Sequence, residues 1–541
     1  MKKTFLSNRL NNIKYMLYSI LMCVIAFTIH SCLTVNAETK PYEKIGVNYL
    51  ETDFFGNSPY NVPHDVDKPG DSTQLALSVF AWKEFIALNW PSTYNAEKGV
   101  YNRATPYTGK DALSKFLKPD AKGKLVWHTY KHRVEMYPKN IDNYNKQFDS
   151  PPKYMYDGNI KGLSSNKPFD QVTVFNNLDE TSEINLCTLF VEGDPNSPGA
   201  NDFNNPGIAS GLPGAPRRMI YEAKANRVMF DYVVKTGLYD SIIRKAWMQT
   251  TDYNIKNKGL GATYLKNPPA GMIVFPFGEI GGSEGSIEVK ATWRQLTLNE
   301  YKSGRYLTAP IIYYRGGTLA SPNPNGQAYY EIVDGEPTYD KKGKLKTLPY
   351  GLVGLHIIHK TKNFPSYVFT TFEQVDNLST KEESLNKLFY YNRNENPFIS
   401  SGKQSVYTRS NPILADTDKV NNLAHAQIKK NDPNSVWQYY KLIGVQGHPV
   451  QNDNTTDYYL SNIATETNAV LANFSGTLDT QRGTKDPTGI NVYQRRNKIV
   501  QGGCKGCHGN AQMADFSFIT KNAPIKEVDF INQPLLIKNQ K

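Results

Sequence analysis

The sequence predicts an α+β fold with an antiparallel, β-rich central region, flanking amphipathic helices and a C-terminal loop segment. Three observations support this prediction. Apolar residues recur at helical spacing before the centre, the spacing changes to alternation after Pro268, and helical spacing returns after residue 420. The central strands follow one another too closely to be joined by helical crossovers, which favours antiparallel pairing.

The first predicted element is an amphipathic helix over residues 74–90. Asp71 and Ser72 are its candidate N-caps, and Pro91 is its expected stop. The apolar side of this helix carries Leu75, Val79, Trp82, Phe85 and Ile86. Such a stripe is typical of a helix that packs against a core.

Four further helices are predicted on the two sides of the centre. One pattern covers residues 219–239 and ends at Gly237, and the next helix begins at a cap formed by Asp240. After the centre, helical spacing returns at residues 420–430 and 458–474. A polar, glycine-containing connection then leads to the C-terminal segment.

The central strands are predicted from alternation of polar and apolar residues. In residues 287–294 the apolar side chains point one way and the polar ones the other, which indicates a half-buried strand. The same style continues over residues 306–314, 328–333, 352–360 and 367–375. Asp340-Lys341-Lys342-Gly343-Lys344 is predicted to form a turn between two strands.

The first 37 residues have the layout of a secretory signal. Four basic residues precede an apolar stretch of about fourteen residues, which is short for a membrane span. Cleavage after Ala37 fits the small-x-Ala form, and cleavage before Cys32 would give a lipoprotein. The expected location is therefore periplasmic or otherwise extracytoplasmic, with Cys32 as the candidate lipid anchor. Residues 38–474 are predicted to form the α+β body, β-rich over about 270–380, and 475–541 the C-terminal segment.

The number and arrangement of charged residues indicate which partners to expect. The formal net charge is +12, and it falls to +8 when the four basic residues of the signal are removed. Such a field would favour acidic partners, but we prefer the interpretation that the charge belongs to an ordinary solvated basic surface. No Lys/Arg run or basic-aromatic array of the nucleic-acid-binding kind is present, so we expect no nucleic acid as a partner.

The most specific motif is C-x-x-C-H at Cys504, Cys507 and His508, the attachment pattern of a c-type haem. Each thiol can bond one vinyl group of the porphyrin, and the histidine is placed to coordinate the iron from the proximal side. A structural zinc site would need two more Cys or His ligands nearby, and none is found in the sequence around the motif. The flanking glycines also favour a flat ligand over a redox dithiol at a helix start. The expected cofactor is one covalent haem c with its iron.

Four stretches together resemble a group of large, secreted bacterial cytochrome c-like proteins with one haem motif near the C-terminus. They are the run Phe80-Ala81-Trp82-Lys83-Glu84-Phe85-Ile86-Ala87-Leu88-Asn89-Trp90-Pro91, Val353-Gly354-Leu355-His356-Ile357-Ile358-His359-Lys360-Thr361, Thr371-Phe372-Glu373-Gln374-Val375-Asp376-Asn377, and the haem motif followed by Asp515-Phe516-Ser517-Phe518. The resemblance spans most of the mature chain. It implies a haem-attachment loop and export, and it assigns defined roles only to Cys504, Cys507 and His508.

The distal iron ligand has to come from upstream of the motif. Only 33 residues follow His508, and Met513 is too close to it along the chain to reach the opposite side of the haem. His356 and His359 are the first candidates, because they lie on a predicted apolar strand. Residues three apart on a strand face opposite sides, so at most one of the two meets the iron. The other candidates that the sequence leaves open are His128, His132, His425, His448 and Met272.

These observations predict a monohaem c-type cytochrome-like protein that transfers single electrons to a redox partner protein. The alternative is a haem enzyme of the peroxidase or oxidase type, or a haem-based sensor, with an open sixth iron site. The chain length favours the alternative, because electron transfer needs only about a hundred residues. No residues for a second, haem-independent chemistry are found among the sequence motifs.

Overall fold

The computed structural model groups the chain into two units, Met1–Asn48 and Tyr49–Lys541. The structure describes residues 48–66, 73–138, 141, 144–152, 154, 174–178, 180–181, 189–191, 219–259, 267–296, 298–315, 329–377, 389–391, 412–447, 462, 464–465, 492–495, 498–501, 504 and 508–523. The predicted signal at 1–37 lies outside them. No helix in this described part combines the length and apolar character that a membrane span requires.

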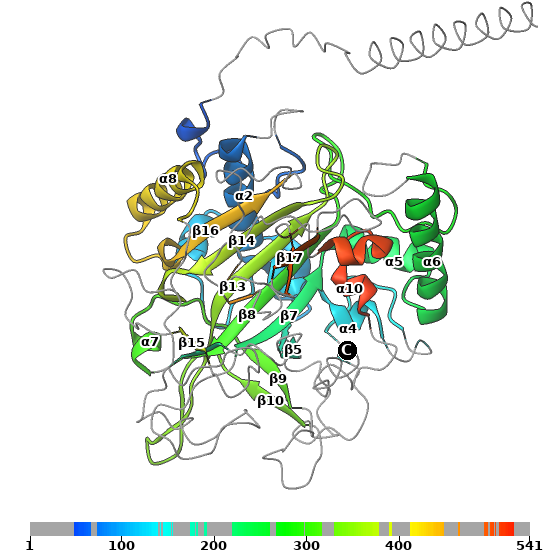
Figure 1. Cartoon of the computed structure of the whole chain (residues 1–541). Helices are drawn as coiled ribbons and strands as arrows, with labels where there is room; N and C mark the ends of the chain where they lie inside the picture. Colours follow the sequence, from blue (N-terminus) through cyan, green and yellow to red (C-terminus); the bar gives the residue numbers. More distant parts are fainter. Residues whose placement is uncertain are drawn as a thin grey trace, which may run out of the picture. The chain divides into compact units, whose positions relative to one another are not determined.

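A large antiparallel sheet forms the centre of the second unit (Figure 1). Its strands run in the order β16-β14-β13-β8-β7-β3. In addition, β5 pairs with β7 at Ile220 and Tyr221. These strands are β3 (Lys131–His132), β5 (Glu180–Thr181), β7 (Met219–Ala225), β8 (Ile287–Gln295), β13 (Tyr350–His359), β14 (Val368–Gln374) and β16 (Tyr440–Gln446). The predicted α+β class with an antiparallel β-rich centre is therefore confirmed.

Smaller strand pairs surround the central sheet. β9 (Ile311–Arg315) pairs antiparallel with β10 (Tyr329–Val333) and parallel with β4 (Asn176–Leu178). The predicted turn at 340–344 joins the hairpin of β11 (Thr338–Tyr339) and β12 (Leu345–Thr347). The remaining pairs are β1 (Ser92–Asn95) with β2 (Val100–Pro106), β6 (Leu189–Val191) with β15 (Phe389–Tyr391), and β17 (Val492–Arg495) with β18 (Lys498–Gln501).

One face of the central sheet is covered by α2 (Gln74–Leu88), which lies beside α8 (Ala415–Asn431) (Figure 1). The Thr73 side chain caps α2 by accepting from the Ala76 N–H, so the cap is Thr73 and neither of the two predicted residues. Phe85 stacks on Phe372 of β14 with ring centroids 4.2 Å apart. The Trp82 indole donates to Asn421 of α8 across 2.9 Å. Aromatic packing and one buried hydrogen bond thus join both helices to the sheet.

The other face carries a second core at the β7 end of the sheet. α5 (Arg227–Thr236) and α6 (Ser241–Lys258) follow β7, and the short α4 (Arg133–Met136) and α10 (Phe518–Lys521) lie on the same side. Ala223 and Ala225 of β7 pack with Phe230 of α5 and with Ile519 of α10. The short helix α10 near the end of the described chain therefore shares a core with β7 and α5, which lie more than 250 positions earlier in the sequence.

The other predicted helices are confirmed only in part. The predicted helix over 219–239 is wrong in its first third, where β7 forms, and α5 begins only after the Asn226 cap. Gly237 ends α5 in the left-handed region, and Asp240 caps α6, as predicted. The predicted helix at 420–430 is the larger part of α8. Most of 458–474 lies outside the described residues, and Ala464 and Thr465 within it form a turn.

Candidate functional site

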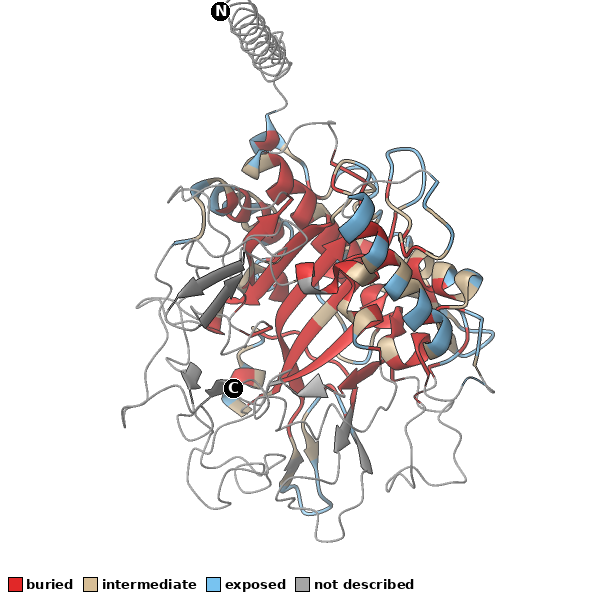
Figure 2. Ribbon diagram, turned by 45° about the vertical axis from the view of Figure 1, so that its right-hand side comes forward, coloured by how far each residue is buried: buried red, intermediate tan, exposed pale blue. Residues whose placement is uncertain are grey.

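The face of the central sheet opposite α2 is polar and yet buried. On β8 the side chains of Glu288, Lys290 and Thr292 point to this face, and β13 adds His356. All residues of β13 and β14 are buried, and so are seven of the nine in β8. Figure 2 shows this burial along the sheet. The predicted half-buried strand is thus wrong in one respect: the alternation is present, but elements of the same chain also cover the polar side.

His359, one of the two distal candidates, faces α2. Its Nδ1 lies 2.8 Å from Oε1 of Glu84, and its Nε2 contacts the Glu284 carbonyl. Burial by itself lowers the pKa of His359, but the Glu84 carboxylate and the Glu284 carbonyl raise the pKa above its ordinary value. Both ring nitrogens are therefore engaged in a buried ion pair and a backbone hydrogen bond on the helix-covered face.

The C-terminal segment lies against the polar face. Cys504 is half-buried and packs beside Ile358, Phe369 and Phe516. Cys507 lies outside the described residues. His508 precedes η7 (Gly509–Ala514), and its Nδ1 is 2.7 Å from the Phe516 carbonyl oxygen. Because a carbonyl only accepts, Nδ1 carries the proton and the imidazole lone pair is on Nε2.

The ring of His508 is surrounded by three other rings. The centroid of Phe518 is 4.7 Å away and that of Phe369 is 4.8 Å away. The third ring is His356, at 6.0 Å with 34° between the planes. Of the two distal candidates, His356 is the one that the structure brings to the motif histidine.

Burial lowers the pKa of His356 well below its ordinary value, and His508 and Lys290 act in the same direction. His356 is therefore a neutral imidazole. Neutral imidazole is the form that coordinates a metal ion.

The two imidazoles could hold the iron of the haem that the sequence motif predicts. A metal-ligating histidine usually donates its other ring N–H to a carbonyl or carboxylate, as His508 does. With metal–nitrogen bonds of about 2 Å, as for histidine on zinc, the 6.0 Å between the ring centres would leave room for one ion bound by both rings. The described residues contain no cluster of three or more His, Cys, Asp or Glu side chains suited to a metal ion. A porphyrin supplies the remaining ligands itself.

A strained turn holds the Phe516 carbonyl in place. Asp515 and Phe516 both have positive φ, 52° and 65°, a conformation that bulky residues rarely adopt. The buried Asp515 carboxylate accepts from the Phe275 N–H at 2.7 Å and forms an ion pair with Lys360, the residue after β13. Burial raises the pKa of Asp515, while Lys360 and the Phe275 N–H oppose this rise. The ion pair and the backbone hydrogen bond stabilise the reversal of the chain.

Two further contacts fix the segment after the turn. The hydroxyls of Tyr137, the residue after α4, and Thr520 on α10 are 2.7 Å apart, and both residues are buried. The Arg244 guanidinium on α6 donates to the Ala523 carbonyl at 3.2 Å. Sequence reasoning assigned no role to Asp515, Lys360 or Tyr137. The available signal was that Asp515 and Lys360 both lie in stretches that carried the resemblance.

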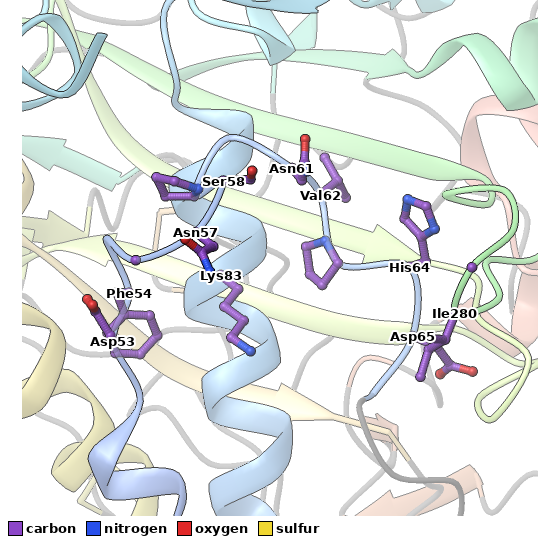
Figure 3. Close-up of a pocket in the computed structure, with 14 residues that line it drawn as sticks. Asp53, Phe54, Asn57, Ser58, Asn61, Val62, His64, Asp65, Lys83 and Ile280 are labelled. Atoms are coloured by element: carbon purple, nitrogen blue, oxygen red, sulfur yellow. The ribbon is translucent and has the colours of Figure 1, made fainter. Parts of the chain in front are cut away.

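A separate cavity of about 320 Å³ lies between α2, the loop of residues 53–65 and residues 280–281 (Figure 3). Lys83 and His64 line it, with Asp53 and Asp65. The Asp65 carboxylate accepts from the backbone N–H groups of Val66 and Asn363, so its role is structural. None of the lining residues belongs to residues 504–523, and the cavity is therefore not part of the site around His508.

No protein-family model, curated protein or solved structure matches this chain. The resemblance to cytochrome c-like proteins therefore remains an expectation from the sequence. The interpretation of the site rests on the geometry of His356, His508 and the segment that holds them.

We expect Glu84→Ala to lower the free energy of unfolding by about 3–5 kcal/mol at pH 6, because it leaves a buried imidazolium unpaired. Because the pKa of His359 is raised in the folded protein, its ion pair with Glu84 stabilises the fold fully at pH values below the ordinary histidine pKa. This stabilisation is lost as the pH rises through the pKa of His359 in the folded protein. Urea unfolding at pH 6 and pH 9 measures both effects. Lys83→Ala on the same helix is the control, with an expected effect below about 0.5 kcal/mol. Equal losses in the two variants would contradict the prediction.

Asp515→Ala is expected to destabilise the C-terminal segment more than Asp515→Asn. Both variants break the buried pair with Lys360, a loss of about 3–5 kcal/mol, but asparagine still accepts from the Phe275 N–H and tolerates the left-handed region. Limited proteolysis at residues 504–523 and urea unfolding are the measurements. The exposed pair of Lys362 and Glu279 provides the control, since Lys362→Ala should cost under about 1 kcal/mol.

Proposed function

We propose that this protein is an exported monohaem c-type cytochrome-like protein that carries single electrons. Cys504 and Cys507 would attach the haem, His508 would be its proximal iron ligand, and His356 its distal ligand. When bound, the haem supplies a reversible one-electron couple. The observation that carries the proposal is the 6.0 Å separation of the His356 and His508 rings, since these residues are 152 positions apart in the sequence.

The surroundings of the two histidines support a carrier. The Phe516 carbonyl fixes the orientation of His508, and Phe369 and Phe518 pack on its ring. His356 is 5% exposed and lies on the inner strand β13, paired on both edges. Two protein ligands held this firmly favour a filled sixth iron position, which suits electron transfer better than chemistry on a bound molecule.

The proposed partner is a protein that donates or accepts one electron. The net positive charge of the chain favours an acidic partner surface. Export follows from the layout of residues 1–37, and Cys32 is the candidate lipid-anchor residue.

Cys504→Ala combined with Cys507→Ala should abolish covalent haem, because no thiol remains to bond the vinyl groups. The measurement is peroxidase staining of the exported protein on a denaturing gel, with absorbance at the haem band. His508→Ala is the companion variant: it should keep some attachment and alter the spectrum, since only the iron ligand is lost. Intact staining in the double cysteine variant would refute haem attachment at this motif.

For His356, the prediction concerns carbon monoxide. The wild-type protein should show a low-spin spectrum in both oxidation states that does not respond to the gas. His356→Ala should become high-spin and bind carbon monoxide, because the sixth position opens. His64→Ala, in the separate cavity, is the control and should behave like the wild type. A high-spin wild-type spectrum that shifts with carbon monoxide would instead favour a haem enzyme or a sensor.

A further inference from the structure

We propose that Glu288 is a proton-binding site coupled to the electron on the haem, and that the hydroxyls of Ser517, Thr520 and Tyr137 form its proton path. The inference rests on the proposed haem function and deepens it. The carrier takes up one proton at Glu288 when it is reduced and releases that proton when it is oxidised.

Glu288 lies on the same buried face of the sheet as His356. It belongs to β8 and pairs in register with Ile358, two residues along β13 from His356. Its side chain is 3% exposed, and its Oε1 has no hydrogen-bond partner in the described part of the chain. A buried ionised carboxylate with an unsatisfied oxygen is costly, whereas the protonated acid is not. The geometry therefore favours a carboxyl group that holds a proton.

The charges around Glu288 point the same way. Lys360 forms its ion pair with Asp515, and the Asp515 carboxylate acts on Glu288 as a like charge. Burial raises the pKa of Glu288 to about 8, with Ser517 lowering it and Asp515 raising it. The titratable and charged groups on the elements around it are Asp515, Lys360, Tyr367, Tyr137, Tyr232 and Arg244. Lys360 is already paired with Asp515, and Lys290, two residues along β8 on the same face, lies with its Nζ 5.1 Å from the centre of the Tyr221 ring.

A chain of hydroxyl groups leads away from Glu288. The hydroxyl that acts on its carboxyl group is that of Ser517, which lowers the pKa of Glu288. The Ser517 hydroxyl donates to Thr520 Oγ1 at 2.9 Å, and Thr520 Oγ1 lies 2.7 Å from the Tyr137 hydroxyl. Each hydroxyl both donates and accepts, so a proton can pass along the chain by successive transfers. Ser517 and Thr520 follow His508 in the same docked segment, which links the path to the haem ligand.

The coupling step is balanced by one electron and one proton. With the haem bound, the redox partner would supply it with one electron. One proton from solvent binds the Glu288 carboxylate, and no other bond forms or breaks. Reduction removes one positive charge from the iron, which stabilises the protonated acid relative to the carboxylate. By linkage, the reduction potential falls as the pH rises, with a limit of about 59 mV for each tenfold change in proton concentration.

The first test needs no haem. Infrared difference spectra of the Cys504→Ala, Cys507→Ala protein between pH 5 and pH 10 should include a protonated carboxyl band that disappears near pH 8, separate from any band of Glu222, Glu284 or Asp515, the other buried carboxyl groups with raised pKa. Glu288→Gln should lack that band. Glutamine has the shape of the protonated acid, so this variant should fold and be the more stable of the two proteins at pH 9. A protein without this band at pH 6, or a band that survives in Glu288→Gln, would overturn the proton site.

The second test uses the haem-loaded protein. Its midpoint potential should fall with pH around pH 8, and Glu288→Gln should be nearly flat over the same range. The control is Glu279→Gln, which removes an exposed glutamate just before β8 and should keep the full dependence. Thr520→Val should keep the equilibrium dependence but slow proton uptake several-fold, measured with a pH indicator after rapid reduction.

The outcomes separate the two proposals. A loaded wild-type protein with a pH-independent potential, or an unchanged dependence in Glu288→Gln, overturns the coupling while the carrier function stands. Proton uptake at the wild-type rate in Thr520→Val overturns the hydroxyl path. Failure to bind haem overturns the proposed function and the coupling together, whereas the infrared titration decides separately whether Glu288 holds a proton.

Discussion

The buried ion pair between Asp515 and Lys360 is the interaction on which the arrangement around His508 depends. It holds a chain reversal in which two successive non-glycine residues have positive φ, and without that reversal the Phe516 carbonyl would not return to His508. The backbone of Lys360 takes part as well, since its N–H donates to the Ser286 carbonyl and its own carbonyl accepts from the Gly278 N–H. Lys360, which pairs with Asp515 of the C-terminal segment, is thus itself held by backbone hydrogen bonds beside the central sheet.

The two histidines of β13 show how one strand supplies two environments. His359 faces α2, where Glu84 raises its pKa and favours the charged form. His356 faces the C-terminal segment, where burial and the neighbouring His508 and Lys290 keep it neutral. Neutral imidazole is the form that coordinates a metal ion. The alternation of side chains along β13 therefore places a structural histidine, His359, on one face and a candidate ligand, His356, on the other.

The sequence predicted more of the fold than of the site. The alternation of residues 287–294 predicted β8, and its continuation predicted β13 and β14, because that signal is local. The placement of His356 and His359 on opposite faces followed from the same periodicity. Which of them meets His508 could not be predicted, since that depends on long-range contacts such as Asp515 with Lys360. Glu288 was missed for the same reason: a polar residue on an alternating strand predicts solvent, and here the C-terminal segment replaces solvent.

The size of the chain, which favoured an enzyme at the level of sequence, has another explanation in the structure. The groups that contact His508 and its segment come largely from distant parts of the chain. The central sheet provides His356 on an inner strand, and α2 and α8 stabilise that strand from the opposite face. α4, α5 and α6 provide the surface on which α10 docks. The large body is therefore what holds His356 beside His508, whatever chemistry the proposed haem would carry out.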